Sequence, residues 1–222
     1  IKMSKINTEP VRKEIATMIG ELKGLVGAYM TNREEIAKIE EKIELVREYK
    51  DGQISEMNQR LANNTKAIFE RLKEEQENLA EALRVNDNTY DFSDPEFSSC
   101  VTLLSVSENA LPYETIVGIA DKFLGNRQAL LALVEVAKGV NKDTLAKKVF
   151  NTESEMESMA EKIADIEINF PESIYMVLML KDKLVLLARA CGEELTEEEQ
   201  DMGADYTEIV MLQTRAAMGL PN

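Results

Sequence analysis

A heptad pattern of apolar residues near the N-terminus constrains the fold of this chain more than any other feature of its sequence. Apolar residues recur at alternating spacings of four and three, and one polar residue occupies the same series. The series is Val11, Ile15, Met18, Leu22, Leu25, Tyr29, Asn32, Ile36, Ile39, Ile43 and Val46. Sustained over about five heptads, it predicts a coiled coil or a long helical hairpin. An asparagine in such a seam lowers stability but can fix the register or the number of helices.

Beyond Asp51 the apolar residues recur every eleven positions, which corresponds to ~3.67 residues per helical turn. Asp51-Gly52 resembles a turn, but Ile43 and Ile54 keep the eleven-residue phase across it. We therefore predict one continuous helix from about Arg33 to Arg84, with any bend at Gly52. The predicted helix–helix interface comprises Ile36, Ile39, Ile43, Val46, Ile54, Met57, Leu61, Ile68, Leu72, Leu79 and Leu83.

The residues before Arg33 leave two arrangements open. Thr31 and Glu34 form a capping-box pattern that predicts a new helix start, and three glycines weaken the helix before it. Residues 9–30 can then either fold back on 33–84 within one chain or continue an extended coiled coil between chains. Both arrangements bury the heptad seam, and packing of the long helix against the bundle is a further way to bury it.

The pattern changes at Val85 to Phe97, a segment rich in Asn and Asp that predicts a linker. It closes with Asp94 as an N-cap and Pro95 at the first helical position. Helices are predicted afterwards near 95–108, 113–124, 126–138, 142–150, 153–168, 172–191 and 197–217. A capping box of Thr196 and Glu199 opens the last of them.

The predicted fold class is therefore all-α, because no segment shows the alternation of a strand. A long coiled-coil helix or helical hairpin occupies residues 1–84, a linker 85–97, and a compact acidic helical bundle 98–222. Two cysteines, Cys100 and Cys191, lie in apolar surroundings and are predicted to be buried free thiols of a cytoplasmic protein.

The chain contains no histidine, which removes the commonest general base and the commonest metal ligand. It also lacks the glycine-rich loops that bind phosphates of nucleotides. Read as a calcium loop, the stretch around Asp51 would place Arg47 first and Asn58 last, which leaves too few oxygen ligands. The acidic stretch Glu193 to Asp205 is better explained as a capped helix start than as a metal site. We predict no catalytic, cofactor-binding or metal-binding residues, and no cofactor.

Charge is distributed unevenly along the chain. Residues 1–84 carry 15 Lys and Arg against 16 Asp and Glu, so the remainder holds almost all of the net charge of −15. That acidic part would repel nucleic-acid phosphates. No apolar run reaches the ~18 residues of a membrane-spanning helix. Neither a nucleic acid nor a membrane is therefore predicted as a partner.

Three functions are compatible with these features. The first is a non-enzymatic structural or assembly protein, a homo-oligomer or a binder of partner helices; by analogy, a phage-type virion, scaffolding or assembly component is one form of it. The second is a regulatory protein whose acidic helical domain captures a basic partner surface. The third is an enzyme that uses carboxylates with Mg²⁺. The extended heptad seam favours the first.

Overall fold

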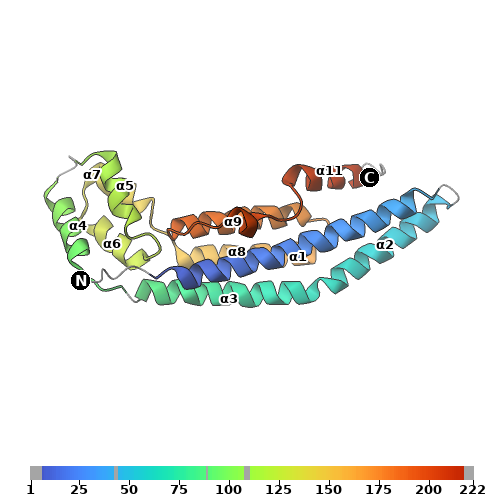
Figure 1. Ribbon diagram of the computed structural model, residues 1–222, viewed down its shortest axis with the longest axis horizontal. Helices are drawn as coiled ribbons and strands as arrows, with labels where there is room; N and C mark the ends of the chain where they lie inside the picture. Colours follow the sequence, from blue (N-terminus) through green and yellow to red (C-terminus); the bar gives the residue numbers. More distant parts are fainter. Residues whose placement is uncertain (1–6, 43–44, 89, 108–110, 218–222) are drawn as a thin grey trace. The chain divides into compact units, whose positions relative to one another are not determined.

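The computed structural model describes residues 7–42, 45–88, 90–107 and 111–217, and the regular structure of these residues is entirely helical (Figure 1). The predicted all-α fold class is therefore confirmed. The helices are α1 (Glu9–Glu40), α2 (Arg47–Asn64), α3 (Lys66–Asn88), α4 (Pro95–Val106), α5 (Tyr113–Asp121), α6 (Arg127–Val136), α7 (Gly139–Ala146), α8 (Thr152–Ile168), α9 (Ile174–Ala190), α10 (Glu197–Gln200) and α11 (Tyr206–Ala217). Among the described helices, none is long and apolar enough to cross a bilayer.

The chain divides into two compact units, each assembled from separated segments. The first unit comprises Ile1–Ile15, Asn78–Met156 and Leu186–Glu194. The second comprises Ala16–Glu77, Glu157–Val185 and Leu195–Asn222. Each unit therefore combines segments from both predicted regions, 1–84 and 98–222.

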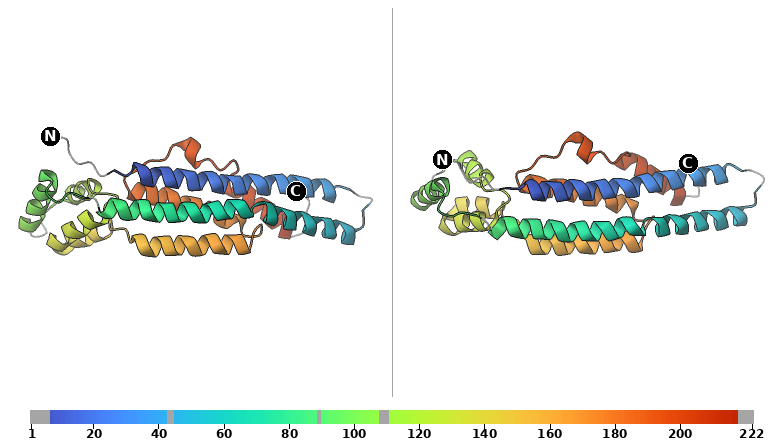
Figure 2. Two further views of the ribbon diagram at one scale, coloured as in Figure 1. Left: turned by 90° about the horizontal axis from the view of Figure 1, so that it is seen from below. Right: turned by 60° about the horizontal axis from the view of Figure 1, so that its bottom comes forward.

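In the second unit, α1 runs antiparallel to α2 and α3, and segments of α8 and α9 lie alongside (Figure 2). The contacts between these helices are both apolar and ionic. Phe69 of α3 meets Phe170, in the segment between α8 and α9, edge to face at 5.6 Å between ring centroids. Arg71 of α3 donates to both carboxylate oxygens of Glu21 on α1, at 2.9 and 2.8 Å. The core includes the buried residues Met18, Leu22, Leu25, Leu72, Met159, Ile163, Ile166, Val177, Leu180 and Leu184.

The predicted helix start at Thr31 is wrong, because α1 continues without a break to Glu40. The Thr31 hydroxyl donates to the carbonyl of Gly27 at 3.0 Å, one turn earlier, and so bonds within the helix instead of capping a new one. Packing of the α1 face overrides the weak helix propensity of the glycines before it.

The predicted continuous helix from Arg33 to Arg84 is also wrong. The chain reverses between Glu40 and Arg47, and Lys50 Nζ donates to the carbonyl of Glu40 at 2.8 Å from across this turn. In the sequence, the heptad spacing of apolar residues continues through this turn. In the structure, however, the Val46 side chain is 71% exposed and does not belong to a helix–helix contact. Of the two arrangements left open, the structure contains the hairpin within one chain, with its turn later than expected.

The predicted bend at Gly52 is wrong too. Gly52 lies inside α2, where Arg47 and Asp51 form an ion pair at 2.9 Å with the spacing of a regular helix. The helix is interrupted instead at Thr65, between α2 and α3. The Thr65 hydroxyl donates to the carbonyls of Leu61 and Ala62 at 3.0 and 3.2 Å, a bonding mode that bends helices.

The core of the first unit is formed by α4 to α7. Asp94 caps α4 as predicted, accepting the Glu96 N–H at 2.8 Å, with Pro95 in the first turn. Ahead of α4, Tyr90 packs edge to face against Phe97 and Phe123 at 5.6 and 6.0 Å. The buried cluster comprises Phe97, Cys100, Leu104, Ile116, Ile119, Ala120, Phe123, Ala129, Leu130, Leu133, Val134, Ala137 and Leu145.

The predicted helix 197–217 is divided in two. The capping box of Thr196 and Glu199 is present and opens α10, as predicted. After one turn, Gly203 adopts a left-handed φ of 75° and its N–H donates to Asp201 at 2.9 Å. Asp205 then accepts the Glu208 N–H at 2.7 Å, which starts α11 as a separate helix.

Cys100 and Cys191 are buried free thiols, as predicted. Burial raises the pKa of Cys191 to about 12, and the charges of Asp87 and Glu193 act in the same direction. Burial also raises the pKa of Cys100. Because the thiolate is the reactive form, we expect both cysteines of the folded chain to resist a disulfide exchange reagent at mildly alkaline pH and to react once denaturant is added. Rapid labelling of both thiols before unfolding would contradict the burial.

Candidate functional site

The α1–α2 hairpin encloses an open groove of about 590 Å³ in the second unit. The groove, called here the hairpin groove, runs between the last turns of α1 and the body of α2. Its lining residues are Gly27, Ala28, Thr31, Asn32, Glu35, Ile39, Gln53, Glu56, Met57, Arg60, Leu61 and Asn64. Ile39, Met57 and Leu61 give it an apolar floor, while charged and amide side chains supply the rest.

A polar pair joins the two helices beside this groove. Asn32 Nδ2 of α1 donates to Asn58 Oδ1 of α2 at 2.9 Å, and Asn32 is only 8% exposed. A buried amide needs a hydrogen-bond partner, so this pair selects one alignment of α1 against α2. The sequence identifies Asn32 as the polar member of the seam, but Asn58 lies off the predicted seam.

The predicted interface residues fall into three groups. Ile36, Leu61 and Leu72 are buried in the second unit, and Leu79 and Leu83 in the first. The half-buried residues are Ile39, Ile54, Met57 and Ile68. Val46 is exposed, and Ile43 lies outside the described residues. The structure thus brings Ile39, Met57 and Leu61 together in the hairpin groove, and contacts within the chain bury much of the remaining seam.

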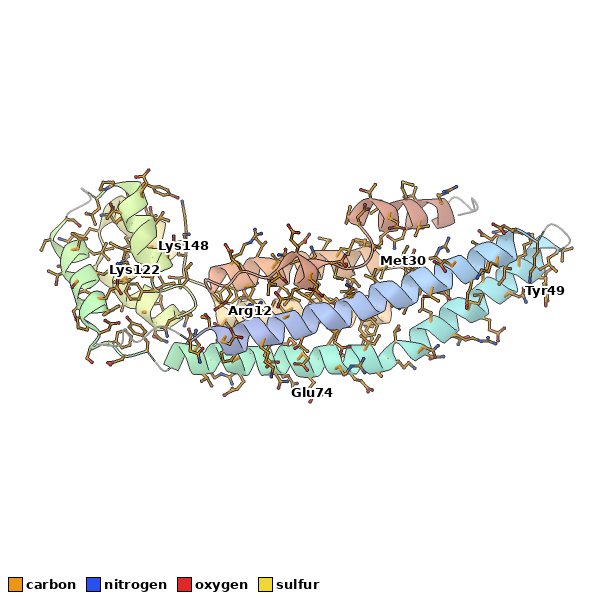
Figure 3. All side chains as sticks on the ribbon, in the orientation of Figure 1. Arg12, Met30, Tyr49, Glu74, Lys122 and Lys148 are labelled. Carbon is orange, nitrogen blue, oxygen red and sulfur yellow. The ribbon has the colours of Figure 1, made fainter. Side chains whose placement is uncertain are left out.

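The rim of the hairpin groove carries charges of both signs. Glu56 and Arg60, both in the lining, form an ion pair at 2.5 Å. The Arg47–Asp51 pair repeats this arrangement nearer the start of α2. Tyr49, 53% exposed, projects from the same end of α2 (Figure 3). This surface is mixed in sign and offers apolar and aromatic groups to a partner.

A second hollow of about 550 Å³ in the same unit is lined by Tyr29, Arg33 and Asn58 together with Pro171, Glu172, Gln213 and Thr214. Burial raises the pKa of Tyr29; the charge of Arg33 lowers it and that of Glu172 raises it, both less strongly. Gln213 Nε2 donates to the carbonyl of Glu172 at 2.6 Å, which joins α11 to this hollow. The sequence did not predict this hollow, because the residues that line its opposite sides lie far apart along the chain.

Several carboxylates of the acidic stretch 193–205 have hydrogen-bond or ion-pair partners. Glu199 belongs to the capping box of α10. Asp201 accepts the Gly203 N–H and pairs with Lys23 at 3.0 Å, and these contacts lower the pKa of Asp201 in that order. Over the described part of the chain, no three Asp, Glu or Cys side chains are grouped so that they could hold a metal ion.

The hairpin groove therefore combines a helix-lined apolar floor with a rim of mixed charge. Such a surface is suited to packing another helix. No protein-family model matches the chain, and the searches of curated proteins and of solved structures found no match either.

Proposed function

We propose that this protein is a non-enzymatic assembly protein that self-associates by packing α1–α2 hairpins of two copies together. The observation that carries the proposal is the half-buried apolar floor of the hairpin groove, formed by Ile39 and Met57. The absence of histidine from the sequence also favours a structural role. A phage-type virion, scaffolding or assembly component is one form that such a protein takes.

The rest of the chain covers the apolar side chains of the hairpin only in part. A pair of helices buries only the stripe along which they touch, and further helices are needed to enclose a core. In α2, Ile54 and Met57 remain half-buried, and Val46 just before the helix is 71% exposed. Two such hairpins packed together would form four helices around these side chains.

The distribution of charge favours a second copy as the partner. Copies of one chain carry the same net charge of −15 and repel each other. That charge resides almost wholly beyond residue 84, whereas the hairpin belongs to the nearly neutral part. The alternating signs of Arg47, Asp51, Glu56 and Arg60 allow unlike charges of two copies to face each other.

The test is the mass in solution of Met57→Asp and Ser55→Asp, measured by light scattering after size exclusion. Ser55 is exposed on the same helix and is the matched control. We expect the unchanged protein and Ser55→Asp to exceed the monomer mass of 25.0 kDa, and Met57→Asp to fall to it. Melting followed by circular dichroism confirms that each variant is folded.

A mass of 25.0 kDa for the unchanged protein over a wide concentration range would overturn self-association. Equal masses for the two variants would show that the hairpin groove is not the interface. A four-helix contact between hairpins also requires the dimer to persist in added salt, because apolar burial is not screened. Dissociation by moderate salt would indicate an ionic contact instead.

A further inference from the structure

The hollow of about 550 Å³ that is bordered by α11 lies wholly within the second unit, and is called here the α11 hollow. Three parts of the chain meet around it: the α1–α2 hairpin, the segment between α8 and α9, and α11. Its volume is typical of small-molecule sites in proteins, which combine apolar surface with a few polar groups. Tyr29 and Pro171 supply apolar rings to its lining, and Asn58 and Gln213 supply amides.

The sequence places Tyr29 on the buried face of α1. Tyr29 continues the heptad series that begins at Val11, so its ring packs with the apolar face of the helix, and only 4% of the residue is exposed. The charges of Arg33 and Glu172, both in the lining, act on the Tyr29 hydroxyl. The hydroxyl at the end of this buried side chain is therefore directed into the α11 hollow.

The Tyr29 hydroxyl has no hydrogen-bond partner among the described residues. The hydroxyl of Tyr90 also lacks a partner, but it is closed off from solvent. Tyr29 Oη is not closed off in this way, so it keeps accessible surface, and the hollow provides that access. Buried tyrosine hydroxyls usually find a partner. A molecule in the α11 hollow can reach this one and bond to it.

The charges of the described lining cancel. Arg33 brings one positive charge and Glu172 one negative charge. An anion in the hollow would be repelled by Glu172, and a cation by Arg33. Burial raises the pKa of Tyr29, so its hydroxyl stays protonated at neutral pH and can donate. The lining therefore favours a neutral molecule with a hydrogen-bond acceptor.

The two amides of the lining are each engaged at one end. Asn58 Oδ1 accepts from Asn32 at 2.9 Å, which leaves Nδ2 of Asn58 as a donor. Gln213 Nε2 donates to the carbonyl of Glu172 at 2.6 Å, which leaves Oε1 of Gln213 as an acceptor. Together with the Tyr29 hydroxyl, the lining offers donors for a carbonyl and an acceptor for an N–H. An amide group carries both.

We propose that the α11 hollow binds a small neutral molecule that carries an amide group on a flat apolar body. The carbonyl of the ligand accepts from the Tyr29 hydroxyl, and its N–H donates to Gln213 Oε1. The apolar body packs against the rings of Tyr29 and Pro171. The hairpin groove and the α11 hollow share no described lining residue, so this proposal stands or falls separately from self-association.

The test uses benzamide as the probe and the full chain as the receptor, in a titration followed by ligand-observed NMR. Benzoate, benzylamine and toluene have a similar size and carry a negative charge, a positive charge and no hydrogen-bonding group, respectively. We expect benzamide to bind saturably. The other three should bind more weakly by roughly fivefold or more, because each meets a like charge or leaves the hydroxyl unpaired.

Tyr29→Phe removes the hydroxyl and keeps the ring. It should weaken benzamide binding by roughly fivefold and leave toluene binding unchanged. Its melting temperature should equal that of the unchanged protein, because the hydroxyl has no bond to a described residue to lose. Tyr175→Phe is the matched control, since Tyr175 belongs to the same unit, is 39% exposed, and does not line the hollow.

Several outcomes would overturn the proposal. They are no saturable binding of benzamide, binding of benzoate, benzylamine or toluene as tight as that of benzamide, and benzamide binding that Tyr29→Phe leaves unchanged or that Tyr175→Phe weakens equally. A lower melting temperature of Tyr29→Phe would show that the hydroxyl already has a partner in the chain, and would overturn it as well. Saturable benzamide binding that is weakened in Tyr29→Phe and kept in Tyr175→Phe would support it.

Discussion

Phe69→Ala is expected to lower the free energy of unfolding by about 3–5 kcal/mol. Phe69 is 1% exposed in the core of the second unit. Its ring meets that of Phe170 at 5.6 Å and an interplanar angle of 74°, a geometry that adds about 0.5–1.5 kcal/mol beyond burial. Removing the ring leaves a cavity that the surrounding helices fill only in part. Denaturant unfolding followed by circular dichroism measures the loss.

Glu70→Ala is the matched control for Phe69→Ala, because Glu70 is exposed and follows Phe69 on the same helix. Its unfolding free energy should change by no more than about 0.5 kcal/mol. If Phe69→Ala loses less than about 1 kcal/mol, Phe69 does not occupy the closed core described for this unit. Phe69→Leu should fall between the two, since it keeps part of the buried apolar volume.

Asn126→Ala is expected to cost about 2–4 kcal/mol, because two hydrogen bonds of one buried side chain are lost together. Asn126 is 1% exposed, and its Oδ1 caps α6 through the Ala129 N–H. Its Nδ2 donates to the carbonyl of Asn86 at 2.6 Å, and the substitution leaves that carbonyl without this donor. The melting temperature and the hydrogen exchange of α6 amides report the loss.

Asn126→Asp separates the two contributions. Aspartate keeps the cap on Ala129 N–H but cannot donate to the Asn86 carbonyl. We expect it to restore the exchange protection of the α6 start while leaving the protein less stable than with asparagine. A stability of Asn126→Ala within about 0.5 kcal/mol of the unchanged protein would show that neither bond contributes.

Local signals in the sequence predicted helix starts well. Asp94 with Pro95, and Thr196 with Glu199, cap the helices they were expected to cap, because a cap depends on residues within one turn. Gly203 was missed as a helix end, although a left-handed glycine beside an acidic residue is a known terminator. The capping pattern at Thr31 was misleading, since the apolar face of α1 continues through it.

The turn of the hairpin could not be predicted from periodicity. Ile43 and Val46 continue the seam spacing, and the stretch from 41 to 46 contains neither glycine nor proline. What accompanies the reversal is a contact between residues on either side of it, from Lys50 to the carbonyl of Glu40.

The candidate site was predicted only in part. Ile39, Met57 and Leu61 were expected on an interface and line the hairpin groove. Their identification as an interface between chains remains a prediction. The hydrogen bond from the Arg127 N–H to Asp87 was not predicted, because these residues meet only when the end of α3 reaches the start of α6. Nothing in the local sequence of either residue signals that meeting.

The order of segments in the second unit also has a consequence for synthesis on the ribosome. Lys73 of α3 pairs with Glu167 of α8, which follows 94 residues later, and Lys23 pairs with Asp201, 178 residues away. At about 5–20 residues per second, the apolar face of α3 waits roughly 5–20 s for α8 to be made, and that of α1 waits longer. During that interval a nascent hairpin exposes apolar surface that the finished chain covers, and neighbouring nascent chains on one messenger could pair through it before α8 exists.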